Sequence, residues 1–515
     1  MRSRAVPLLL AVLLPALLRA QIWTTPLKTE EKPGEAPWTR VGQEAAGSLT
    51  VARAGEVALL LNGPTNRRAC KLLVTVGAHK LEVDLAADSR AHYLGRATLP
   101  VGRHAVRARL EWMADGTGAA LGSALEVAAV GLPAEAPARG PAALELMCPL
   151  FHKWQMERAP AMVDTIAGLG AKRVQFVIAL QSELDESFRV LNYGLVLEDK
   201  AAKEGSRFFP MTEEIRTRLR GWLAAAFARA AYHDLKVDIL LHLNAQGKVQ
   251  EWRNFFDFDP LLPLGGYSYG RALPQTVLEA LQGAVPADWP VSISLQGEMG
   301  TTVMKYPDRW RQLLKQLRKG QTLHNARYGI SLNHEGNRGK AKPQDLNPLA
   351  LNALWQEIDF IGVSMYQRMS VPPTALDFAA NLERFAVEFA GLGAPLPAGK
   401  ELRLVEVGLG GGGMAPDGTF SSPAKELAHL ARAPFQGTSE KDKNPWKRPE
   451  FQAYRRQYHA ALCDFLRTQP ARWLVSVGVL WSFGSWDPHG VDGADFADAE
   501  IVKRIQEHNA AVPGR

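Results

Sequence analysis

Two glutamates occupy positions that packing does not explain. Glu298 lies near the end of the apolar, β-branched segment Val291–Gly300, and Glu406 lies near the end of a similar segment, Arg403–Gly408. Burial of an unpaired carboxylate costs free energy, so a buried strand should not end in one without a reason. If both strands belong to one barrel, the two carboxylates meet at the same end of it. A pair of carboxylates placed in this way is what most enzymes use to cleave a glycosidic bond.

The segment 142–511 predicts strands and helices in alternation. Helical patterns lie between short apolar runs, for instance at 213–231, 308–317 and 451–467. Eight strand–helix units fit a (β/α)8 TIM barrel, an α/β fold, and a doubly wound open sheet is the alternative. The candidate strands are Leu144–Leu150, Arg173–Leu180, Lys236–Leu243, Val291–Leu295, Arg327–Leu332, Asp359–Ser364, Glu401–Val405 and Leu474–Leu480.

Nearly every predicted strand ends in a polar or aromatic side chain suited to a sugar. The C-terminal ends of the strands carry the chemistry in barrels of this kind. Any one of these residues could be a hydrogen-bonded or packed end group, and the prediction depends on their recurrence at successive strands. Besides the two catalytic glutamates, we expect substrate to be bound by His152, Trp154, His242, Asn244, Gln296, Asn333, Tyr366 and Trp481.

Four motifs at these strand ends resemble the large clan of retaining (β/α)8 glycoside hydrolases. They are Gln296-Gly-Glu298, Ile361-Gly-Val-Ser-Met-Tyr-Gln367, Leu404-Val-Glu-Val-Gly408 and Val479-Leu-Trp-Ser-Phe-Gly484. The resemblance implies that Glu298, after the fourth strand, is the acid/base and that Glu406, after the seventh, is the nucleophile. Clan members usually carry Asn directly before the acid/base, whereas this chain has Gly297. We expect Gln296 to take over part of that role by contacting the substrate 2-hydroxyl.

The implied mechanism assigns a charge state to each glutamate. Two carboxyls about 5–5.5 Å apart act as nucleophile and acid/base, with net retention. Glu406 has to be ionised, and Glu298 has to start protonated, its pKa raised by the nearby negative charge and by partial burial. Tyr366 could donate its hydroxyl to Glu406, and Trp481 offers a flat face to a pyranose ring. Glu335 is the competing candidate for the acid/base.

The N-terminal region predicts an exported protein with a second domain. Residues 1–20 carry a basic start and an apolar stretch too short to span a bilayer comfortably, as in a secretory signal, and an uncleaved anchor is the alternative. Short alternating strands separated by turn residues predict a β-sandwich. Within it, Tyr93–His104 resembles the closing strands of carbohydrate-binding modules, and a purely structural sandwich is the alternative. The boundaries are 21–46 for an extended lead-in, 47–130 for the sandwich, 131–141 for a linker and 142–511 for the catalytic barrel.

Composition excludes several other classes of function. The net charge of +7 is scattered, which argues against a nucleic-acid partner. The glycines of 408–413 are followed by Pro416, where a dinucleotide motif needs a helix, and no zinc-binding His pair occurs, so we expect no cofactor and no metal. The three cysteines, Cys70, Cys148 and Cys463, form no disulfide scaffold, although one pair could be bridged.

The sequence therefore predicts a secreted or periplasmic retaining glycoside hydrolase of β-linked polysaccharide or oligosaccharide. An endo-β-glucanase or β-mannanase is slightly preferred, because long loops with many aromatic residues could wall an extended cleft. A non-catalytic exported glycan-binding protein on the same barrel is the alternative. No membrane span is expected after signal cleavage, and sugar identity and oligomeric state stay open. The aromatic residues of these loops are Trp252, Phe255, Phe256, Tyr267, Tyr269 and Trp446.

Overall fold

The chain forms two compact units, one of 1–136 with 382–398 and one of 137–381 with 399–515. Each unit is described by itself. The predicted leader, 1–20, lies outside the residues that the structure describes. This computed structural model describes residues 22–26, 28–29, 38–52, 54–62, 68–85, 91–115, 120, 126–131, 140–198, 206–397, 399–412, 423–469 and 474–513.

Two antiparallel sheets make up the N-terminal unit. Strand β5 buries every second residue, as a strand with one face on a core does. Buried side chains of both sheets, such as Leu59 and Val74, form one hydrophobic core, which is the predicted sandwich. One sheet has the order β1 (Ile22–Pro26), β9 (Glu126–Gly131), β4 (Gly55–Asn62), β7 (Ala91–Leu99), and the other β2 (Lys28–Thr29), β3 (Glu44–Val51), β8 (Gly102–Met113), β5 (Cys70–Val76), β6 (His79–Leu85). The first two short strands, β1 and β2, lie within the segment predicted as an extended lead-in.

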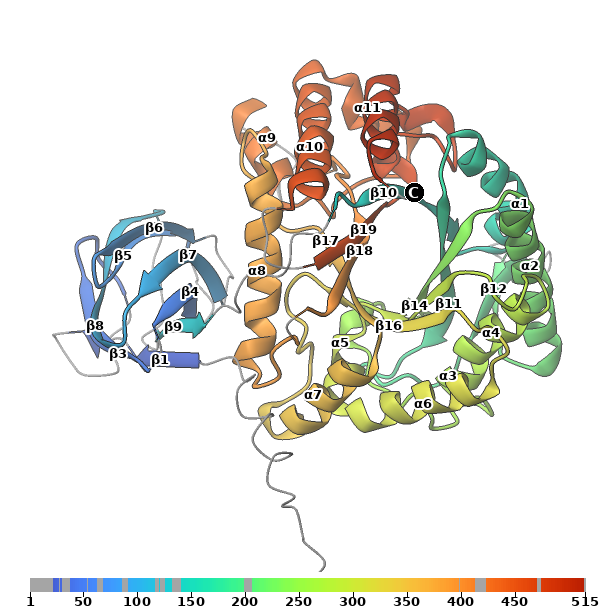
Figure 1. Ribbon diagram of the computed structural model, residues 1–515, viewed down its shortest axis with the longest axis horizontal. Coiled ribbons are helices and arrows are strands. Elements are labelled where there is room, and N and C mark those ends of the chain that lie inside the picture. The colour runs from blue at the N-terminus through green and yellow to red at the C-terminus, as the bar shows by residue number, and fades with distance from the viewer. Residues whose placement is uncertain are drawn as a thin grey trace, which may run out of the picture. The chain divides into compact units, whose positions relative to one another are not determined.

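Eight parallel strands close into a barrel in the second unit (Figure 1). Each strand pairs with its neighbour in chain order, and the last pairs with the first. This confirms the predicted fold class and excludes the open sheet. The strands are β10 (Ala143–Leu150), β11 (Arg173–Glu183), β14 (Lys236–Gln246), β15 (Val291–Gly297), β16 (Ala326–Asn333), β17 (Phe360–Met365), β18 (Glu401–Val407) and β19 (Leu474–Leu480).

Helices connect the strands and present apolar stripes to them. In α6, Trp310, Leu313, Leu314 and Leu317 are buried, which is the spacing of one helical face. A hairpin of β12 (Gly194–Glu198) and β13 (Ser206–Pro210) extends β11 and was not predicted. The helices are α1 (Lys153–Gly168), α2 (Glu213–Tyr232), α3 (Tyr269–Ala272), α4 (Pro274–Gln282), α5 (Gly300–Lys305), α6 (Pro307–Gly320), α7 (Pro348–Glu357), α8 (Ala375–Gly391), α9 (Pro423–Arg432), α10 (Pro449–Thr468) and α11 (Ala499–Ala510).

The barrel interior is filled, so that a site can form only at its mouth. Asp238 bonds Arg173 at 2.6 Å and Arg403 at 3.1 Å near the start of the strands. Above them lies an apolar layer of Met147, Val177, Leu240, Val405, Val477 and Val479, against which Phe151, Trp481 and Phe483 pack. Charged and apolar layers of this kind leave no channel through the barrel.

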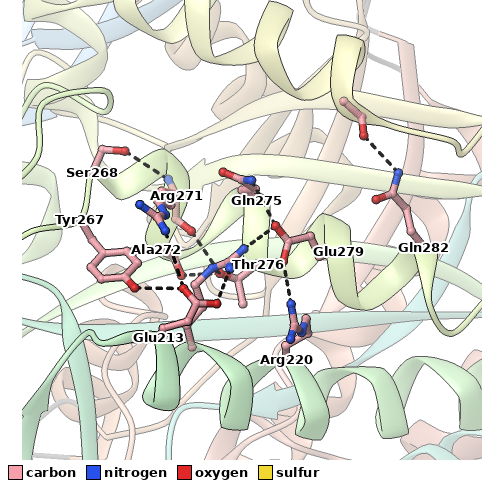
Figure 2. A network of polar contacts seen from close by, with 12 residues as sticks. Glu213, Arg220, Tyr267, Ser268, Arg271, Ala272, Gln275, Thr276, Glu279 and Gln282 are labelled. Carbon is pink, nitrogen blue, oxygen red and sulfur yellow. Dashed lines mark hydrogen bonds and ion pairs between the residues drawn. The ribbon is translucent and has the colours of Figure 1, made fainter.

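A polar network joins α2 to the loop before α3 and to α4 (Figure 2). The Tyr267 hydroxyl donates to Glu213 at 3.1 Å, and Arg220 donates to Glu279 at 3.1 Å. Tyr267 therefore faces α2, which corrects the expectation that it walls a cleft.

Three further points concern the described residues as a whole. No helix among them is long and apolar enough to cross a membrane. The same residues contain no group of His, Cys, Asp and Glu that could hold a metal ion. Cys70, Cys148 and Cys463 are all free and buried, so the pairing that the sequence left open is not made.

Candidate active site

The two glutamates lie together at the C-terminal mouth of the barrel. Glu298 directly follows β15, and Glu406 lies near the end of β18, with only 6% and 3% of their surfaces exposed. Burial, and after it the negative charge of Glu298, raises the pKa of Glu406 well above its usual range. The two carboxyls are therefore close enough for the charge of Glu298 to act on Glu406.

Polar groups from two other strands lie around Glu406. The Tyr366 hydroxyl, directly after β17, hydrogen-bonds its carboxyl, and Ser364 lies opposite Glu406 in β17. The His242 Nε2 lies 3.0 Å from Glu406 Oε1. This contact is not an ion pair, because complete burial lowers the pKa of His242 well below its usual range and keeps the ring neutral.

Glu298 has a cation and an indole as its partners. Arg253 Nη1 donates to Glu298 Oε2 at 2.8 Å, and Trp252 Nε1 donates to the same oxygen at 3.1 Å. Arg253 Nη2 also donates to Asn244 Oδ1 at 2.8 Å, which fixes the guanidinium over the mouth. Charge-assisted donors favour a carboxylate at Glu298.

This arrangement differs from the charge states that the mechanism requires. We expected an ionised Glu406 and a protonated Glu298, whereas the raised pKa lies on Glu406 and the donors lie on Glu298. The physical reason is that Glu406 is enclosed in the barrel, while the guanidinium of Arg253 reaches Glu298.

The ring of His242 leaves no room for a side chain at position 297. A Cβ at this position would lie 2.6 Å from both Cδ2 and Nε2 of that ring. An Asn at this position, as in the clan that the sequence motifs resemble, would therefore collide with His242.

Two of the residues predicted to bind substrate form hydrogen bonds to the backbone instead. Gln296 is fully buried, its Nε2 donates to Ser331 O at 2.7 Å, and its Oε1 accepts from Met299 N at 2.7 Å. This corrects the expectation that Gln296 contacts a sugar. Asn333 Nδ2 donates to Glu335 O at 2.8 Å and so fixes the loop after β16.

The other predicted ligands lie around the mouth at different depths. Trp481 stacks on Phe151 with ring centroids 5.5 Å apart and remains partly exposed. His152 and Trp154 are exposed at the start of α1, and Trp154 packs with Arg158 at 5.7 Å. No contact joins these two to either glutamate among the interactions of the described residues.

The competing carboxylate and most of the loop aromatics lie elsewhere. The side chain of Glu335 is 74% exposed, and the His334 ring lies 3.9 Å away, so Glu335 lacks the buried setting of an acid/base. Phe256, Tyr269 and Trp446 are buried and cannot wall a cleft, which corrects that expectation. Trp252 remains 37% exposed beside Glu298.

Arg253 and Ser364 are site residues that the sequence analysis missed. Ser364 lies in the motif at the sixth strand, two residues before Tyr366. Its place near the end of the strand could have identified it as a site residue. Arg253 lies in the long loop after β14, where no periodicity indicates which side chain turns toward the barrel.

No protein-family model matches this chain, and none of the curated proteins matches it. Solved structures give distant likenesses. A GH113 β-mannanase from Alicyclobacillus acidocaldarius is 14% identical, with 72% of this chain and 98% of that chain covered and a TM-score of 0.41. A GH26-CBM35 β-(1,4)-mannanase from Podospora anserina is 13% identical, with 95% and 96% covered and a TM-score of 0.28. At these identities and TM-scores the likenesses carry no argument about substrate or mechanism.

Proposed function

We propose that this protein is a retaining glycoside hydrolase of β-linked polysaccharides or oligosaccharides, with Glu406 as nucleophile and Glu298 as acid/base. The observation that carries the proposal is a pair of buried carboxyls at the barrel mouth, where the charge of one raises the pKa of the other. Repulsion and desolvation both oppose folding, so stability gives no reason to keep such a pair. A double displacement requires one.

The two steps use the groups around each carboxyl. Glu406 attacks the anomeric carbon while Glu298 protonates the leaving oxygen, and Glu298 then takes a proton from the water that releases the sugar. The hydrogen bond from Tyr366 favours the ionised form of Glu406. The acid/base role requires a protonated Glu298 when substrate is bound, so Arg253 has to loosen its contact as the sugar enters.

The substrate class follows from the aromatic faces at the mouth. Trp252 and Trp481 keep part of their surfaces exposed, and indole faces pack well on the apolar faces of pyranose rings. We favour an endo-acting β-glucanase or β-mannanase, exported to the periplasm or the medium by the leader predicted at residues 1–20.

A non-catalytic glycan-binding protein is the second candidate, and one observation favours it. Arg253 and Trp252 both donate to the carboxyl oxygen of Glu298 that an acid/base would need for its own proton. A catalytic site that no longer turns over could keep such a contact permanently.

A polysaccharide panel separates the two candidates. Purified protein is incubated with β-mannan, β-glucan and xylan, and the first product is followed by proton NMR. The proposal expects reducing ends that first appear in the β configuration. Initial α products would exclude retention, and saturable binding without any new reducing ends would establish the binding protein.

A further inference from the structure

Strand β18 contains a bulge directly before Glu406. Leu404 lies opposite Val363 of β17, but Glu406 lies opposite the next residue of β17, so Val405 is the extra residue. Consecutive residues of a regular strand face opposite sides. Here Val405 packs in the interior layer, while Glu406 reaches His242 inside the mouth. The bulge is therefore what turns Glu406 inward.

A buried glutamine supplies the contact that the bulge removes. Gln175 Nε2 donates to Val405 O at 2.6 Å, and Gln175 is only 2% exposed. Gln175 is on β11, which is not a neighbour of β18 in the sheet, so the bond crosses the barrel interior. The extra residue of a bulge is left out of the ladder, and a buried carbonyl without a partner is costly.

Strand β15 repeats this arrangement before Glu298. Ser294 lies opposite Gly329 and Gly297 lies opposite Ser331, so two residues of β15 face one of β16. The side chain of one of those two, Gln296, spans from Ser331 O to Met299 N. Gln296 thereby fixes the backbone on both sides of Glu298. The φ of Glu298 is +59°, in the left-handed region that non-glycine residues seldom adopt.

We propose that Gln175 and Gln296 are positioning residues that hold the two bulges and so aim the two carboxyls at one point. The inference rests on the catalytic roles proposed above. Neither glutamine touches substrate. Gln175 bonds the backbone at the bulge of β18, Gln296 bonds it at the bulge of β15, and each bulge directly precedes a glutamate of the site.

The kinetic test replaces each amide by a side chain of similar length without hydrogen-bonding groups. Gln175→Met and Gln296→Met should each lower kcat about 100-fold, the loss expected for a displacement of ~1 Å at the reacting atoms, with KM changed only a few-fold. Val177→Ala is the matched control, because it removes volume from the same strand and interior layer but leaves Val405 O bonded. An unchanged kcat in the glutamine variants, or an equal loss in the control at equal thermal stability, overturns the proposal.

Gln175→Glu tests the same bond if the methionine variant does not fold. A buried carboxyl is held protonated and can donate its O–H to Val405 O, so this variant should keep clearly more activity than Gln175→Met. Equal losses in the two variants would contradict a role for the donated hydrogen bond.

Crystal structures of the variants give a result that does not depend on turnover. The Glu406 carboxyl should shift in Gln175→Met and the Glu298 carboxyl in Gln296→Met, each relative to wild type, with the other carboxyl in place. Carboxyls that stay in place in both variants overturn the inference. If wild type cleaves no glycoside, the proposed function fails, yet these shifts still show whether the glutamines hold the bulges.

Discussion

The charge on each glutamate decides what the mouth of the barrel can do. Burial favours a proton on Glu406, and the donors from Arg253 and Trp252 favour a negative charge on Glu298. Double displacement needs the reverse distribution at the moment of attack. Arg253 therefore has to move away from Glu298 when a sugar binds, so that Glu298 can carry the proton that the leaving oxygen needs.

Glu406→Gln should abolish turnover and keep glycan binding, because it replaces the nucleophile by a group of nearly the same shape. We expect kcat to fall by at least about 10³-fold, as for the loss of a nucleophile in other enzymes. The matched control is Glu335→Gln, in which an exposed carboxylate is changed in the same way. Loss of activity in the control with retention in Glu406→Gln would reverse the assignment.

Arg253→Met should move the acidic limb of the pH profile to higher pH. The positive charge of Arg253 lowers the pKa of Glu406, so its removal raises that pKa further. The acidic limb of kcat/KM reports ionisation of the nucleophile in the free enzyme. Lys340→Met is the control, because this cation lies over the ring of Phe255 at 4.4 Å. A limb that stays in place or moves to lower pH would show that Arg253 does not act on Glu406.

At the scale of elements, three loops are joined around one buried side chain. Asn254 Nδ2 donates to Gly336 O at 2.7 Å, its Oδ1 accepts from Gly300 N at 3.0 Å, and its carbonyl accepts from Thr301 at 2.6 Å. The loops after β14, β15 and β16 are thus fixed to one another. A Cβ at position 300 would lie 2.1 Å from Asn337 O, so only glycine allows this close approach. The junction holds Arg253 and Trp252 over Glu298.

Asn254→Ala should therefore loosen the loop after β14 and lower kcat/KM. Gly300 N and Gly336 O would lose their partner, and the buried Gly300 N would then be unsatisfied at a cost of about 1–3 kcal/mol. Hydrogen exchange should become faster in the peptides that contain residues 252–256 and 336–341, with the strands of the barrel unchanged. Unchanged exchange in both peptides would show that Asn254 does not join the loops.

The predicted elements agree with the structure where a local pattern is sufficient. The last barrel strand, Leu474–Leu480, has the predicted bounds, because a run of buried apolar residues is visible in the sequence. The hairpin of β12 and β13 was missed, because its strands are short and are held by pairing to β11. The two bulges depend on register with neighbouring strands, which no single segment reveals. Gln296 was accordingly taken for a sugar ligand.

The sequence also could not predict which aromatic side chains of the loops face a cleft. Trp446 donates to Ser485 O at 2.6 Å and lies under Arg455, while Tyr269 donates to Leu295 O at 3.0 Å. Both were predicted to wall a cleft. An aromatic side chain in a loop has the same sequence signature whether it faces a ligand or packs on the next helix, so only the tertiary structure separates the two cases.

At the scale of the whole molecule, the division between the two units runs through one helix. Residues 382–398, which include the second half of α8, group with 1–136, while the first half groups with the barrel. In that first half, Phe378 packs on Tyr458 and Phe465 of α10. A helix forms cooperatively along its length, so the two units share an element that cannot be divided without cost.

The shared helix predicts that the barrel is less stable alone than in the full chain. A variant that begins at Pro137 should have a lower Tm than the full chain without residues 1–20, because the second half of α8 loses the unit with which it groups. Calorimetry of the full chain should show one cooperative transition rather than two, since melting of either unit disrupts α8. Two well-separated transitions, with a truncated barrel that melts at the temperature of the second, would mean that the units fold independently despite the continuous helix.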